Sequence, residues 1–234
     1  MTAIETAELS LRRSRALMVA ALALLAAVYV RALAFTPVEA TQGPAQKIFY
    51  VHVPSAWVAF LAFAVVGVCS VLYLIFKEPR LDRIAAASAE VGVVFTTGVL
   101  LTGPIWAKPI WGAWWTWDAR LSSTLFLWFL YFAYLVLRTA VQEQGQRARY
   151  SAVLGILGAL LVPFIHLSVQ MFRTLHPQAV VMNPEGPTLP GSMLATLLFS
   201  LAVMTLLYTG LVWHRYAQAE RDEARAERAA DDAR

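Results

Sequence analysis

The sequence predicts an all-α fold: an integral membrane bundle of six transmembrane helices with an external, Trp-rich interfacial segment. The composition carries the first part of this prediction, because 59% of the 234 residues are hydrophobic and only 15% are charged. Soluble domains of this size have about 25% charged residues. The apolar residues also gather into six runs, each close to the ~20 residues that cross a bilayer as a helix. In lipid every backbone N–H and C=O needs an internal partner, so these runs should be helical.

The expected spans lie between short polar links. They are Leu17–Phe35, Val53–Phe76, Ile84–Ile105, Leu121–Leu137, Ala152–Val169 and Met193–Trp213. The first run is too long for a cleavable signal peptide, and a poor small-residue cleavage site follows Arg31, so we expect it to remain as a span. Pro104 and Pro109, together with Gly112, are expected to break the chain after the third span.

Two domains are expected. Residues 1–216 form a six-span membrane domain, and residues 217–234 form a charged cytoplasmic tail. The tail mixes acidic, basic and Ala residues without an apolar stripe, so it is either a solvated helical extension or disordered.

Basic residues are distributed unequally between the two sides of the predicted bundle. Of the 19 Lys and Arg residues, 14 lie near the termini or in the links after spans two and four. The positive-inside bias therefore places both termini in the cytoplasm and the Trp-rich segment outside. The other five are Arg31, Lys47, Lys108, Arg120 and Arg173. The net charge of +4 follows from this topology and gives no reason to expect nucleic acid.

Several chemistries lack their sequence signatures. The single Cys69 lies within the second span and cannot form an intrachain disulfide. The chain has no Gly-rich phosphate loop, no Cys-x-x-Cys and no His-Glu-x-x-His. If ATP is used, another subunit must bind it.

Five Trp residues occur within twelve positions, from Trp106 to Trp117. Interfacial belts contain Trp in all membrane proteins, but one or two would suffice for that role. Trp111 and Trp114 are three residues apart and Trp115 follows, so a short helix in the interface would present them on one broad aromatic face. Asp118 would complete that stripe.

Two histidines lie on the same predicted side as the Trp residues. Pro54 suits the first turn of a helix, so His52 is expected just outside the second span. His176 lies in the Pro-rich loop Phe172–Pro190. Either histidine alone is best explained as a hydrogen-bonded surface residue. As a pair beside a Trp cluster they indicate haem, whose iron accepts an imidazole on each face and whose propionates pair with Arg or Lys.

Other ionisable residues in the spans leave alternatives open. His166 is either a functional group or a neutral imidazole bonded to a neighbouring helix. Glu90 is either paired with Arg83 or protonated. His214, at the cytoplasmic boundary, is expected to be inert.

The run Trp111-Gly112-x-x-Trp115-x-Trp117-Asp118-x-Arg120 resembles the Trp-rich WWD signature of haem-handling proteins in cytochrome c biogenesis. With six spans and a histidine before the second and the sixth, the chain resembles the CcmC family, haem exporter protein C, over nearly its whole length. The relatives CcmF and CcsA are longer, with more spans.

The resemblance implies a role that composition alone does not. Proteins of this family bind haem b on the periplasmic face of the bacterial inner membrane and present it to the haem chaperone CcmE. They are not enzymes themselves and work with the ATP-binding cassette subunits CcmA and CcmB and the small subunit CcmD. By this resemblance His52 and His176 are the axial ligands of the haem iron. The haem platform and chaperone-docking surface would comprise Trp106, Trp111, Gly112, Trp114, Trp115, Trp117, Asp118 and Arg120.

Two other functions remain as alternatives. A permease that exports haem or another substrate would need polar residues along a continuous path through the spans, for which Glu90 and His166 are thin support. A membrane oxidoreductase with two haems inside the bundle would need about four intramembrane histidines, and only His166 qualifies.

Overall fold

The computed structural model of the chain describes residues 2–178, 180–181 and 186–233. Its long helices are α1 (Ala3–Val30), α2 (Phe49–Phe76), α3 (Pro79–Trp111), α4 (Ala119–Ala140), α5 (Gln144–Met171) and α6 (Gly191–Asp232). A π-helical turn, Arg31–Phe35, extends α1, and a 3-10 turn, Pro44–Ile48, precedes α2. In the described part of the chain six helical segments are long and apolar enough to cross a membrane. The predicted all-α membrane fold is confirmed.

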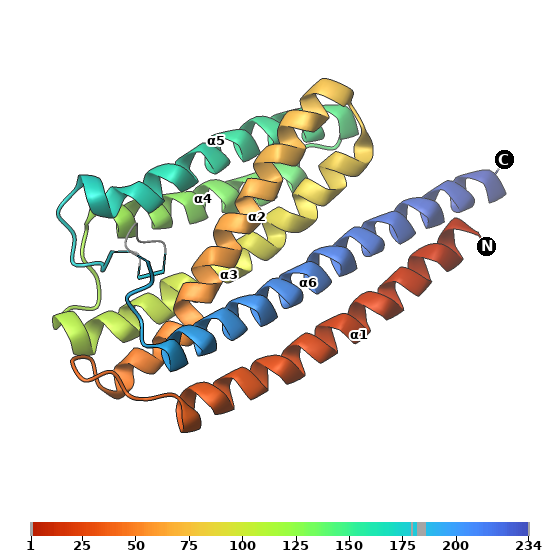
Figure 1. Ribbon diagram of the computed structural model, residues 1–234. Coiled ribbons are helices and arrows are strands. Elements are labelled where there is room, and N and C mark those ends of the chain that lie inside the picture. Colours follow the sequence, from red (N-terminus) through yellow and green to blue (C-terminus); the bar gives the residue numbers. More distant parts are fainter. Residues whose placement is uncertain (1, 179, 182–185, 234) are drawn as a thin grey trace.

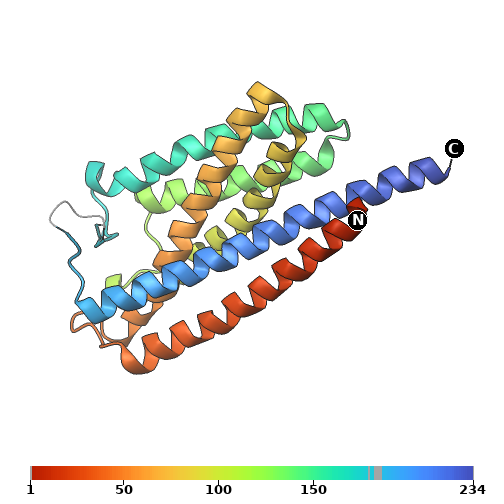
Figure 2. The ribbon, with the colours of Figure 1, turned by 45° about the vertical axis from the view of Figure 1, so that its right-hand side comes forward.

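The helices form two groups that meet at α2 and α3 (Figures 1 and 2). α1 and α6 lie side by side over most of their lengths, and both chain termini lie at one end of the molecule. α4 and α5 pair on the opposite side, where α5 also packs against α2. We call the end with both termini the terminal end. The opposite end, where α1 joins α2, α3 joins α4 and α5 joins α6, is the loop end.

Aromatic rings and glycines make the centre of the bundle close-packed. The rings of Phe63 in α2 and Tyr131 in α4 stack with their centroids 3.8 Å apart. A Cβ on Gly92 of α3 would lie 2.6 Å from the Phe63 ring, and a Cβ on Gly158 of α5 would lie 2.5 Å from the Tyr131 ring. Helices in lipid rely on such small residues for close approach. This packing holds α2 to α5 in fixed relative positions and so fixes the loop end.

The first turn of α2 differs from expectation. Because α2 begins at Phe49, His52 lies within the helix and not outside it, and Pro54 lies in its interior. Pro54 has no N–H to bond the carbonyl of Tyr50. The Ser200 hydroxyl of α6 donates to that carbonyl instead, at 2.6 Å. This substitute donor explains how the helix passes through a proline.

The expectation that prolines break the chain after the third span is wrong. α3 continues through Pro104 and Pro109 to Trp111. Transmembrane helices tolerate proline when neighbouring groups satisfy the freed backbone. The helix ends at Gly112, which adopts the left-handed conformation (φ 75°) that favours glycine, and Lys108 donates to the Gly112 carbonyl at 2.9 Å.

The charged tail is helical, which resolves the alternative left open by its composition. α6 continues without interruption across residues 216 and 217 to Asp232. Ala217 of α6 and Ala7 of α1 are buried where the two helices pack. Arg225 pairs with Glu8 at 3.3 Å. The tail therefore extends the α1–α6 pair at the terminal end.

Ion pairs connect the helices at the terminal end. Arg138 of α4 makes two hydrogen bonds with Asp82 of α3, at 2.6 and 2.9 Å, and both side chains are largely buried. Glu90 pairs with Arg215 of α6. The expected alternative, in which Glu90 pairs with Arg83, is wrong, because Arg83 pairs with Glu223 in the tail.

Candidate functional site

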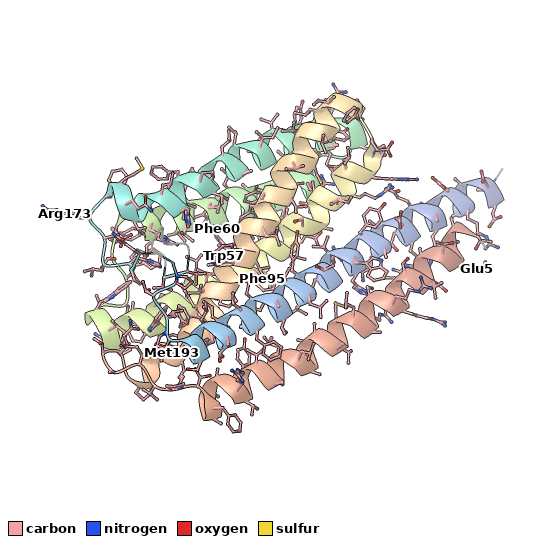
Figure 3. The ribbon with its side chains drawn as sticks, viewed as in Figure 1. Glu5, Trp57, Phe60, Phe95, Arg173 and Met193 are labelled. Atoms are coloured by element: carbon pink, nitrogen blue, oxygen red, sulfur yellow. The ribbon has the colours of Figure 1, made fainter. Side chains whose placement is uncertain are left out.

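A partly enclosed cleft of about 100 Å³ lies at the loop end between α2, α3 and α4. Its inner part is apolar and reaches Phe60 of α2, labelled in Figure 3, and Leu127 of α4. Its outer part is lined by His52, Trp106, Trp111, Trp115, Arg120 and His176. The structure therefore brings together the two histidines that the sequence analysis singled out, with three of the five clustered Trp residues.

His52 is buried at the α2–α3 contact with one nitrogen engaged. Its Nδ1 lies 2.9 Å from Oγ1 of Thr102. The Thr102 hydroxyl donates its single proton to the Gly98 carbonyl at 2.7 Å, so it accepts from Nδ1–H. This pairing leaves Nε2 of His52 with a free lone pair. Gly103 makes room for the ring, because a Cβ there would lie 3.3 Å from Cε1 of His52.

His176 lies in the non-helical segment after α5 and has the same tautomer. Its Nδ1 lies 2.8 Å from the Pro177 carbonyl, which can only accept, so Nδ1 carries the proton and Nε2 the lone pair. Burial, reinforced by the nearby Arg120 guanidinium, lowers the pKa of His176 to about 4. At neutral pH the imidazole is therefore uncharged, the form that binds metals.

The Trp cluster divides into an inward and an outward set. Residues 113–118 are not helical, so the expected single aromatic face on a short helix is wrong, because Gly112 has already ended α3. Trp111 and Trp115 line the cleft together with Trp106. Trp114 and Trp117 point outward and are 58% and 80% exposed.

Asp118 does not complete an aromatic stripe, as expected, but caps a helix and joins two segments. Its Oδ1 accepts the backbone N–H of Leu121 at 2.9 Å and so caps the N-terminus of α4. Its Oδ2 accepts the hydroxyls of Thr116, at 3.0 Å, and Thr174, at 2.8 Å. Asp118 therefore joins the Trp-bearing segment to the segment that carries His176.

Of the five basic residues assigned to this side of the bundle, Arg120 is the one that lines the cleft. Lys47 and Lys108 donate to backbone carbonyls, and Arg31 donates to a threonine hydroxyl on α6. Arg173 is exposed and points away from the bundle in Figure 3. Among the described residues the cleft thus contains a single cationic side chain.

Two donors in the cleft lack partners among the described residues. No hydrogen bond or ion pair joins the Arg120 guanidinium to another described side chain. The indole N–H of Trp115 is buried and also unpaired. Both are therefore available to an acceptor on a ligand, and such an acceptor would give the Trp115 N–H the hydrogen bond that buried polar groups normally make. No cluster of three or more His, Cys, Asp or Glu residues in the described chain could hold a bare metal ion.

The sequence analysis missed three residues that support the site. Gln42 accepts the indole N–H of Trp106 at 3.1 Å, and Thr102 bonds His52. Neither has a local sequence signal, because each partner is 50 or more positions away. Thr174 lies two residues before His176 and accepts its N–H at 3.0 Å, a turn pattern typical of Ser and Thr that the sequence does contain.

Comparison with known proteins identifies the family. The family model for heme exporter protein C, CcmC, matches residues 2–230. Heme exporter protein C of Bradyrhizobium diazoefficiens is 38% identical over 192 residues, 82% of this chain and 73% of that protein. The protein of the same name from Haemophilus influenzae is 35% identical over 195 residues, 83% and 79% of the two chains. A putative cytochrome c biosynthesis ccmC-like mitochondrial protein of Marchantia polymorpha is 36% identical over 158 residues, 68% and 66% of the two chains.

The resemblance found in the WWD signature, the six spans and the match over nearly the whole chain all agree: the chain belongs to the CcmC, heme exporter protein C, family.

Proposed function

We propose that this chain binds haem in the loop-end cleft and presents it to the haem chaperone CcmE during cytochrome c maturation. One observation carries the proposal: His52 and His176 arrive from distant segments and line the same cleft. Each bonds through Nδ1, so each has an Nε2 lone pair for the iron. The names of the relatives, which describe heme exporters, support the same cargo.

The rest of the cleft suits haem b. Its apolar inner part matches the hydrocarbon edge of a porphyrin, and the indole faces of Trp111 and Trp115 suit a flat, polarisable ring. The unpaired guanidinium of Arg120 and the indole N–H of Trp115 are donors for the propionates. A haem brings its own four equatorial nitrogens to the iron, so two imidazoles complete its coordination.

Haem requires the cleft to widen. Its volume of about 100 Å³ lies below the ~300–1,000 Å³ typical of small-molecule pockets. Two of its walls are the non-helical residues 113–118 and 172–178, which can separate without disrupting a helix once the Thr174–Asp118 hydrogen bond between them breaks. Such a site is suited to handing its cargo on, because opening breaks this bond and unfolds no helix.

The outward Trp residues form the proposed chaperone-docking surface. Trp114 and Trp117 are exposed next to the cleft, and Trp117 packs edge-to-face against Trp115 inside it, with centroids 5.8 Å apart. Exposed Trp residues are frequent anchors of protein interfaces. A chaperone that binds them would contact the wall of the haem cleft.

The membrane setting follows from charge. In the sequence, 14 of the 19 basic residues lie near the termini or in the links after the second and fourth spans, so the positive-inside bias favours both termini in the cytoplasm and the loop end outside. Membership of the CcmC family makes a bacterial inner membrane, with the loop end in the periplasm, the setting that we propose. In this arrangement the chain handles haem and is not an enzyme. ATP hydrolysis belongs to a partner subunit in the ATP-binding cassette complex of CcmA, CcmB and the small subunit CcmD.

The test is the absorption spectrum of the purified protein with and without its histidines. We expect a haem Soret band in the wild type, a weakened and shifted band in His52→Ala and in His176→Ala, and loss of bound haem in the double variant. His214→Ala is the matched control, because His214 bonds Ser14 at the terminal end and should leave the band unchanged. A full, unshifted band in the double variant would refute the ligand assignment.

The permease alternative makes a different prediction. If the chain exports haem with its cassette partners, ATP should drive haem flux into vesicles even when His52 and His176 are both replaced. Haem bound by the isolated chain, without those partners, supports the handling role.

A further inference from the structure

The segment that carries His176 has little regular structure to hold it. α5 ends at Met171, and residues 172–178 form bends and extended backbone. A side chain that must meet a ligand with ångström accuracy needs its own supporting contacts, and loops supply them less well than helices do. His52, by contrast, sits in the first turn of α2.

One hydroxyl supplies the support. The Thr174 side chain donates to Oδ2 of Asp118 at 2.8 Å, because a carboxylate can only accept. The Thr174 Oγ1 also accepts the backbone N–H of His176, at 3.0 Å. Asp118 is itself anchored as the N-cap of α4. The chain of contacts runs from a transmembrane helix through one carboxylate and one hydroxyl to the backbone of His176.

We propose that Thr174 is a positioning residue that holds the His176 imidazole over the cleft, because its hydroxyl links the His176 backbone to Asp118. We call these two hydrogen bonds the clasp. The role in haem binding rests on the proposed function, but the clasp is a property of the protein alone. Supporting hydrogen bonds of this kind typically change metal affinity by about 10–100-fold when they are removed.

Thr174 gives a cleaner test than Asp118. Removing the Asp118 carboxylate would also remove the cap of α4 and the bond to Thr116, so any effect would have several causes. Thr174→Val keeps the shape of the side chain and deletes only the hydroxyl. Thr174→Ser restores the hydroxyl. Thr116→Val is the matched control, because Thr116 also donates to Oδ2 of Asp118 but makes no hydrogen bond with His176 among the described residues.

The first measurement is the haem spectrum and dissociation rate of each full-length variant in detergent. With Thr174→Val we expect a shift of ferric haem from the low-spin to the high-spin form and about 10-fold faster dissociation. Added imidazole should restore the low-spin spectrum, since it replaces the misplaced His176 ring. Thr174→Ser and Thr116→Val should match the wild type. A wild-type spin state and rate in Thr174→Val, or an equal loss in Thr116→Val, would overturn the proposal.

The second measurement needs no haem. Amide hydrogen exchange in peptide 172–178 should be faster in Thr174→Val than in the wild type, and unchanged in Thr174→Ser and Thr116→Val. If the wild-type chain binds no haem, the proposed function fails while this exchange pattern still supports the clasp. Equal exchange in all four proteins contradicts the clasp whatever the haem result.

Discussion

The loop end and the terminal end of this molecule are held together by different kinds of contact. At the terminal end, regular helices are connected by ion pairs between side chains, including the buried Asp82–Arg138 pair. At the loop end, the chain leaves its helices, two Trp side chains are exposed, and two donors that line the cleft lack partners among the described residues.

This difference separates stability from binding. Ion pairs between helices favour one arrangement of those helices, whereas exposed aromatic rings and unpaired donors that line an open cleft can be met by a ligand or partner. The terminal end therefore contributes rigidity and the loop end contributes recognition. A substitution at one end should therefore change the property of that end, stability or binding, and leave the property of the other end unchanged.

The largest expected effect is at the terminal end. Arg138→Ala leaves the largely buried Asp82 carboxylate without its partner, which typically destabilises a protein by about 3–5 kcal/mol. The free energy of unfolding in detergent measures this loss. Haem bound per folded molecule should not change. Replacing both residues by apolar ones of similar size should recover much of the stability, and a double variant as unstable as Arg138→Ala would contradict this explanation.

The outward Trp residues come next. Replacing both Trp114 and Trp117 with Ala should weaken binding of the chaperone by about 30-fold or more, because even one aromatic hot spot at an interface is worth about 2 kcal/mol, or about 30-fold in affinity. Haem retention and unfolding should stay near wild type, since both rings are exposed. Chaperone haem loading measures the effect. Normal loading would show that docking uses another surface.

A smaller effect is expected from the partner of His52. Thr102→Val removes the acceptor of the His52 Nδ1–H, which should lower haem affinity by about 10-fold while leaving chaperone docking intact. Titration of the haem-free protein with haem measures the affinity. Thr102→Ser is the control and should bind as the wild type does. An unchanged affinity in Thr102→Val would mean that packing alone orients His52.

The smallest effect concerns the tail. Arg225 and Glu8 are both about half exposed, and such surface pairs contribute about 0–1 kcal/mol. Arg225→Ala should therefore change the free energy of unfolding by less than ~1 kcal/mol and leave haem binding unchanged. A large loss of stability would show that the α6 extension packs more tightly than its exposure indicates.

The transmembrane architecture was predictable because it depends on sums over many residues. Hydropathy over about 20 positions locates each span regardless of local detail. The sequence also suggested that His52 and His176 act as a pair, because both were expected on the same side of the membrane. The convergence itself depends on how α2, α3 and α4 pack, which composition does not encode.

The structure differs from the sequence-based expectations where a single local signal competes with tertiary contacts. Pro54 and Pro109 suggested helix boundaries, but a hydroxyl on α6 or the surrounding helices can satisfy the freed backbone. The spacing of the Trp residues suggested one helical face, but Gly112 ends α3 before most of them. The N-cap role of Asp118 is a local signal, because Leu121 is three residues away. The bonds of Asp118 to Thr174 and of Thr102 to His52 join residues 56 and 50 positions apart, so no window of residues could have identified them.

The hydrogen bond from Ser200 to the Tyr50 carbonyl has a mechanical consequence. With 42 residues, α6 is roughly 63 Å long at ~1.5 Å per residue, and the part that follows Ser200 continues to Asp232 in the tail. The bond holds the backbone two positions before His52. Because α6 is a continuous helix, a displacement or rotation of α6 at the terminal end would be transmitted to the turn that carries the His52 imidazole.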